Sequence, residues 1–181
     1  MTAALLFLFV LQAPPAAAPA ARAAAARPFA YRGFAPGMAY RDFAARARMI
    51  APGAGDNEQL TCQTMHTSAQ VMDCGVNVRD PVDSARFYLS ANVIEGRTSV
   101  IALVDSGGVA LVKRRQDDLR AQLGAPQRRE RSTWEWTRGR RFIRLSWRGG
   151  AGWRKISITL NDRDVMNRIR NYLPKPKPRR P

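Results

Sequence analysis

The amino-acid sequence predicts an α+β protein built from tandem halves, each a helix plus an antiparallel sheet, with about seven strands in all and a C-terminal helix. Short runs of alternating apolar and polar residues separated by turn residues favour antiparallel strands. Two segments, near 39–50 and 110–123, carry apolar residues at helical spacing. The chain has 181 residues, 45% of them hydrophobic, which is enough for one domain with a buried core.

Residues 1–26 have the pattern of a secretory signal peptide. An apolar run from Ala3 to Leu11 is followed by an alanine-rich stretch with small-residue cleavage sites, although no Lys or Arg precedes the run. Because nine apolar residues are too few to cross a bilayer core of about 30 Å as a helix, we expect no transmembrane anchor. We therefore expect export, either to a periplasm or out of the cell.

The first helix is expected at residues 39–50, after an irregular lead-in at 27–37. Its buried stripe would consist of Tyr40, Phe43, Ala44, Ala47 and Ile50.

The two cysteines fit opposite positions of a β-hairpin. With a turn at residues 67–69, antiparallel pairing places Cys62 opposite Cys74 and Thr64 opposite Met72. Leu60, Met72 and Val76 then share one face, and polar residues occupy the other. We expect a Cys62–Cys74 disulfide, which agrees with export because such bonds persist in oxidising compartments. Two free thiols in a cytosolic protein are the alternative.

A second hairpin should turn at Glu95–Gly96, with Phe87, Leu89, Ala91 and Val93 on the same face as Val100, Ala102 and Val104. A helix is expected at 110–123, ended by Gly124 and Pro126.

Three strands should follow this second helix, the first two joined at Arg138–Gly139. Their shared apolar face would consist of Trp134, Trp136, Ile143, Leu145, Trp147, Ile156, Ile158 and Leu160. Asn161 or Asp162 would cap a final helix that reaches about Leu173. The tail at 174–181 is basic and proline-rich, and we expect it to be disordered.

We interpret residues 27–173 as one domain of two pseudo-repeats, about 35–105 and 106–173. The segment LRAQLGAP, followed by TWEW, resembles the helix end and first strand of envelope domains of the SmpA/OmlA type. The tandem arrangement with one hairpin disulfide is similar to the fold of β-lactamase inhibitory proteins. The likeness covers about twenty residues, Leu119 to Trp136, and the order of elements. It implies a fold only, and the lipidated N-terminal cysteine of the first family is missing.

The net charge of +16 belongs almost entirely to the C-terminal half, since residues 111–181 hold 21 Lys and Arg against 6 Asp and Glu. The predicted register gathers cations and aromatics on the outer face of the last sheet: Arg140, Phe142, Arg144, Arg148, Trp153 and Lys155. Guanidinium groups bind phosphate or carboxylate and stack on aromatic rings, so this face suits an anionic ligand. The alternative is a solvated face whose aromatics are covered by arginine stems.

No catalytic constellation stands out. His66 is the only histidine, at the tip of the cysteine hairpin, and the acidic pairs Asp117–Asp118 and Asp162–Asp164 fit solvated or capping roles better than a metal site. We expect no cofactor and no metal. The sequence therefore favours a non-enzymatic binding protein for an anionic envelope component, or alternatively a protein-binding or inhibitor-like module. A nucleic-acid partner would suit the charge but not export.

Overall fold

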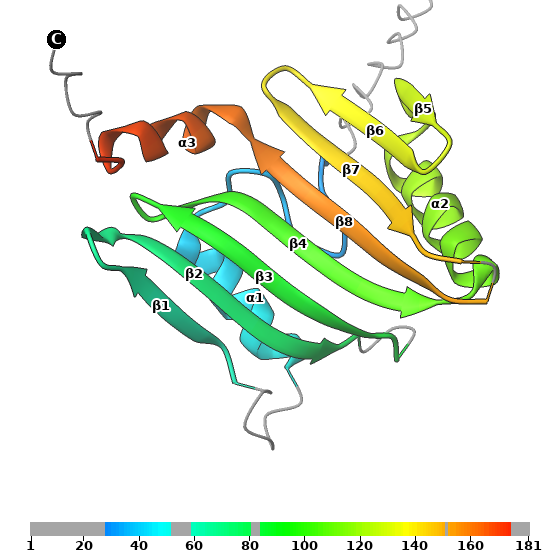
Figure 1. The fold of residues 1–181 in the computed structure, drawn as a ribbon, viewed down its shortest axis with the longest axis horizontal. Helices are drawn as coiled ribbons and strands as arrows, with labels where there is room; N and C mark the ends of the chain where they lie inside the picture. The colour runs from blue at the N-terminus through cyan, green and yellow to red at the C-terminus, as the bar shows by residue number, and fades with distance from the viewer. Residues whose placement is uncertain (1–27, 52–58, 81–83, 151, 175–181) are drawn as a thin grey trace, which may run out of the picture.

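The computed structural model describes residues 28–51, 59–80, 84–150 and 152–174. Within these residues the chain forms one antiparallel sheet of eight strands in the order β1-β2-β3-β4-β8-β7-β6-β5 (Figure 1). In chain order the elements are α1 (Tyr40–Ile50), β1 (Thr61–Met65), β2 (Ser68–Arg79), β3 (Arg86–Ile94), β4 (Arg97–Gly107), α2 (Val109–Leu123), β5 (Arg128–Glu130), β6 (Thr133–Arg138), β7 (Arg141–Arg148), β8 (Arg154–Asp162), α3 (Arg163–Asn167) and the 3₁₀ helix η1 (Arg168–Asn171). The predicted α+β class is confirmed.

Helices α1 and α2 lie on the same face of the sheet, behind it in the view of Figure 1. The main core lies between them and the sheet, and the predicted stripe of α1 is buried there through Phe43, Ala44, Ala47 and Ile50. The lead-in also contributes, because a tight turn pairs Tyr31 with Phe34 and buries both rings. Among the described residues, no helix has the length and apolar character needed to cross a membrane.

The cysteine hairpin has the predicted pairing. Cys62 lies opposite Cys74 and is joined to it by a disulfide, and Thr64 lies opposite Met72. The turn lies at His66–Thr67 rather than at 67–69 as predicted. A register irregularity after Thr64 allows this turn to coexist with the predicted pairing. Cys74 and Val76 are buried in the core, as the alternation predicted.

The second hairpin turns at Glu95–Gly96 as predicted, but its face assignment is wrong. A β-bulge near Ser99 shifts the register, so that Leu89 pairs with Leu103 and Ala91 with Ile101. The core residues of β4 are therefore Ile101 and Leu103, whereas Val100, Ala102 and Val104 lie on the opposite face.

The last sheet segment differs from the prediction in two details. The β6–β7 turn falls at Gly139–Arg140, one residue later than predicted, so Trp134 pairs with Leu145 and Trp136 with Ile143. Because this moves the pairing by two residues, every side chain keeps its predicted face. The sheet also has a strand more than expected, since the charged segment Arg128–Glu130 pairs with β6.

The C-terminal helix lies on the other face of the sheet. The side chain of Asp162 accepts hydrogen bonds from the backbone N–H groups of Asp164 and Val165 and so caps α3. Val165 then packs with Val71 and Ile94 in a small second cluster. The α-helix is shorter than predicted and continues as η1 to Asn171.

Candidate binding face of the sheet

The face opposite α1 and α2 is covered at one end by α3, and no other α-helix of the described residues lies on it (Figure 1). We call it the open face. Strand pairing arranges its side chains in rows that run across the sheet. One row contains Asn77, Tyr88, Val104, Ser157 and Ser146, and the next contains Gly75, Ser90, Ala102, Thr159 and Arg144. Small side chains dominate these central rows.

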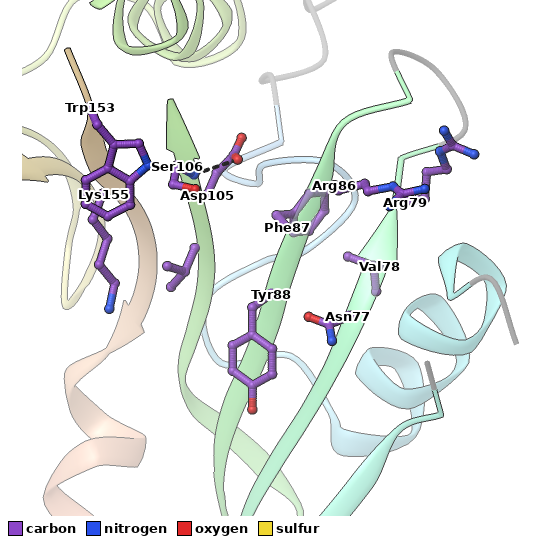
Figure 2. A pocket seen from close by; sticks show the side chains of 11 residues that line it. Asn77, Val78, Arg79, Arg86, Phe87, Tyr88, Asp105, Ser106, Trp153 and Lys155 are labelled. Atoms are coloured by element: carbon purple, nitrogen blue, oxygen red, sulfur yellow. Dashed lines mark hydrogen bonds between the residues drawn. The ribbon is translucent and has the colours of Figure 1, made fainter. Parts of the chain in front are cut away.

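The end of the open face away from α3 is rich in cations and exposed aromatics. We call it the basic end and define it by Arg79, Arg86, Arg148, Lys155, Tyr88 and Trp153. A cavity of about 640 Å³ lies here, with Trp153 and Lys155 on one side and Tyr88 and Asn77 on the other (Figure 2). Tyr88 is 47% and Trp153 57% exposed, which is unusual for large aromatic side chains. The volume lies within the range of about 300–1,000 Å³ typical of ligand sites.

Cations of the basic end stand directly opposite one another on neighbouring strands. Arg79 on β2 pairs with Arg86 on β3, and Arg148 on β7 pairs with Lys155 on β8. Like charges in such cross-strand positions destabilise a sheet. All four side chains are exposed, and among the described residues no carboxylate forms an ion pair with them. Asp105 also lines the cavity but is paired with Arg115, so no carboxylate of the described residues is in ion-pair contact with these four cations.

The predicted cluster is divided by the structure. Arg148, Trp153 and Lys155 lie at the basic end, whereas Arg140 lies in the turn at the opposite end of β7. Arg140 is paired with Asp164. Arg144 donates from Nε and from one terminal nitrogen to Glu135, at 2.9 and 2.7 Å.

The aromatic ring of the predicted cluster nearest to Arg144 is also covered. The guanidinium groups of Arg144 and Arg163 lie 5.2 and 5.1 Å from the centre of the Phe142 ring, which is only 8% exposed. For this half of the cluster, the arrangement matches the alternative in which arginine stems cover the aromatics.

Tyr88, Arg79 and Arg86 belong to the first half of the chain and were not among the predicted site residues. In the sequence, Gly75 was the residue that could have indicated the position of the Tyr88 ring. A Cβ atom on Gly75 would come within 2.1 Å of the Tyr88 hydroxyl, so the ring lies over this position of β2. Glycine within a strand often marks such a close approach.

A buried ion pair supports the basic end from the helix side. Arg115 lies on the same stripe of α2 as Val112 and Leu119 and is 3% exposed, and it donates to Asp105 of β4 at 2.9 Å. Burial alone would lower the pKa of Arg115, but the hydrogen bond with Asp105, together with the charges of Tyr31 and Asp105, outweighs this and raises its pKa above the ordinary value.

The acidic pairs Asp117–Asp118 and Asp162–Asp164 form ion pairs with neighbouring cations. Asp117 pairs with Lys113, Asp118 with Arg115, Asp162 with Arg141 and Asp164 with Arg140. His66 lies exposed in the β1–β2 turn. Within the described part of the chain, no group of three or more His, Cys, Asp or Glu residues is placed to hold a metal ion.

Comparison of the chain with protein-family models, with curated proteins and with solved structures gave no match. The geometry itself is thus the basis for any functional conclusion. Exposed cations beside exposed aromatic rings on a broad sheet face can bind a ligand that combines negative charge with planar or apolar surface.

Proposed function

We propose that this is an exported, non-enzymatic binding protein that recognises an anionic component of the cell envelope through the basic end of its open face. The observation that carries the proposal is the pair of like-charged cross-strand contacts, Arg79 with Arg86 and Arg148 with Lys155, beside Tyr88 and Trp153. Such contacts cost stability in the free protein. A bound polyanion would offset that cost.

An extended anionic ligand, such as an acidic polysaccharide, fits this arrangement best. The four cations lie on β2, β3, β8 and β7, and adjacent strands are about 4.8 Å apart, so the row extends over roughly 19 Å. This span exceeds a single headgroup. The exposed rings of Tyr88 and Trp153 would contact the less polar parts of the ligand.

The exposed aromatics also favour a second candidate, a protein-binding or inhibitor-like function. Tyrosine, tryptophan and arginine are the residues enriched among binding hot spots between proteins. A protein partner would depend chiefly on Tyr88 and Trp153, whereas a polyanion would depend chiefly on the cations.

Export and duplication are parts of the same proposal. The disulfide supports an oxidising compartment. The signal peptide of residues 1–26 lies outside the described residues, and we expect a mature chain that begins between residues 17 and 28. Intact-mass analysis of the exported protein would detect a retained Met1, which would contradict cleavage.

The order of one helix and four strands, occurring twice, supports the two pseudo-repeats of about 35–105 and 106–173.

The function is tested by affinity for heparin, used as a model acidic polysaccharide, and for anionic lipid vesicles. Changing Arg148 and Lys155 together to Gln should weaken binding to heparin at least tenfold and reduce its salt dependence. The matched control changes Arg114 and Arg120 to Gln, which removes two exposed charges from α2 on the other side of the sheet. Equal losses in the two variants would show that only net charge matters and would contradict the proposal.

The basic tail is a separate source of adhesion and needs its own control. Residues 175–181 carry four further cations and lie outside the described residues. Deleting 174–181 should reduce weak, non-specific adhesion and leave most of the heparin affinity. If the deletion abolishes all binding to heparin and vesicles, the open face is not the anion site and the protein-binding function becomes the better account.

A further inference from the structure

A second cavity lies at the opposite end of the molecule from the basic end, where the lead-in, the β6–β7 turn and the start of α3 meet. Its volume is about 690 Å³, within the range of about 300–1,000 Å³ seen for small-molecule sites. Five arginines line it: Arg97, Arg138, Arg140, Arg141 and Arg168. They come from β4, the β6–β7 hairpin and η1, so the fold gathers them from three separate parts of the chain.

The charges around this cavity do not balance. Asp162 and Asp164 are the acidic residues among its lining, and Glu95 reaches Arg168 from the β3–β4 turn. Among the residues that the structure describes, five guanidinium groups and these three carboxylates give a formal excess of two positive charges. An anion that carries two negative charges would neutralise the site.

The arginines are held in place in a way that leaves donors for a ligand. Arg141 uses its Nε to donate to Asp162 at 2.9 Å, and Arg140 uses its Nε to pair with Asp164. A guanidinium has five N–H donors, so the terminal nitrogens of both side chains remain available. Their side chains are half-exposed. A guanidinium fixed on one edge loses less conformational entropy when it binds an anion on the other.

One wall of the cavity is apolar. Phe29 and Ala35 of the lead-in and Val165 of α3 line it together with the arginines. The guanidinium of Arg138 lies 5.0 Å from the centre of the Phe29 ring. The site therefore offers both anion-binding groups and a surface for the carbon skeleton of a small molecule.

We propose that this cavity binds a phosphate monoester, with the dianionic phosphate held by Arg140, Arg141 and Arg168 and the organic part against Phe29. Bidentate donors in a fixed fork match phosphate oxygens well, and the monoester carries the two charges that the site lacks. The site shares no cation with the basic end. Phosphate binding in this cavity and anion binding at the basic end can therefore be tested independently.

Calorimetric titration in a phosphate-free buffer tests the proposal with inorganic phosphate, glycerol 3-phosphate and vesicles that contain phosphatidic acid. We expect saturable binding of glycerol 3-phosphate. Changing Arg140 and Arg168 together to Gln should weaken it about a hundredfold, since each charge-assisted contact is worth roughly tenfold or more. Binding to vesicles that depends on the same two arginines, without binding of glycerol 3-phosphate, would identify a lipid headgroup as the source of the phosphate.

The matched control again changes Arg114 and Arg120 to Gln, because this removes the same charge from the exposed surface of α2. It should change the affinity for glycerol 3-phosphate less than twofold. Modification of the wild-type protein with phenylglyoxal gives a second readout, in which the phosphate compound should protect Arg140 and Arg141 but not the exposed Arg114. No saturable binding by the wild type, equal losses in both double variants, or no selective protection would overturn the proposal.

Discussion

Single arginines on the open face differ in whether a carboxylate of the protein already neutralises them. Arg144 is held by Glu135 through two hydrogen bonds, one from Nε and one from a terminal nitrogen, whereas no described carboxylate pairs with Arg148. An arginine already bound in this way must give up its partner before it can bind a ligand with the same donors. For this reason we assign the anion-binding role to Arg148 and Lys155 rather than to Arg144.

Arg115 should be among the most important single residues for stability. It is 3% exposed and bound to Asp105, so its loss would leave a largely buried carboxylate without its cation. We expect Arg115→Ala to lower the free energy of unfolding by about 3–5 kcal/mol, measured by urea denaturation. Lys113→Ala, which removes an exposed ion pair on the same helix, should cost about 0.5 kcal/mol or less. Similar costs for the two variants would contradict a structural role for the buried pair.

Gly75 should control the position of Tyr88. A Cβ at this site would overlap the Tyr88 hydroxyl, so Gly75→Ala must displace the ring from the open face. We expect the variant to remain folded and to lose heparin affinity by roughly the amount that Tyr88→Ala loses, and the double variant should show no further loss. Additive losses would mean that Gly75 acts through something other than Tyr88.

For individual strands, the alternation of apolar and polar residues predicted the buried face wherever only one face of the strand was apolar. The cysteine hairpin is such a case, because a one-residue slip would expose Val76 and Cys74. The run of β4 is apolar on both faces, with Ile101 and Leu103 on one and Val100 and Val104 on the other. Alternation therefore could not predict which face of β4 is buried. The β-bulge near Ser99 determines that Ile101 and Leu103 face the core. Strand β5 was not predicted because its three residues are all charged and exposed, so they show no apolar alternation.

The edge hairpin β1–β2 should depend on its disulfide. Every residue of β1 is exposed, and the bridge ties this strand to the buried Cys74. The Tyr40 hydroxyl lies 3.3 Å from the Cys62 sulfur and so connects the same point to α1. Changing both cysteines to Ala should lower the unfolding free energy by about 2–5 kcal/mol, measured by urea denaturation. A reducing agent should destabilise the wild type but not the variant; an equal response of both proteins would be inconsistent with a structural bridge.

At the scale of the whole molecule, the candidate site depends on a contact that local patterns do not reveal. The sequence predicted that Arg148, Trp153 and Lys155 lie close together, because they belong to neighbouring strands of one half. Tyr88, Arg79 and Arg86 join them only because β4 pairs with β8 and so fuses both sets of strands into a single sheet. Pairing between strands about fifty residues apart leaves no periodic signal, and this half of the basic end could not be predicted.

We propose that repulsion between like charges at the basic end costs stability in the free protein and is offset when an anion binds there. Arg148→Glu tests both sides of this claim in one protein, since it converts the repulsive contact with Lys155 into an attractive one. We predict that the variant unfolds at higher urea concentration, with a gain of about 0.5–1 kcal/mol, and binds heparin at least tenfold more weakly than the wild type. A variant that is less stable than the wild type, or that keeps full affinity for heparin, would contradict the account.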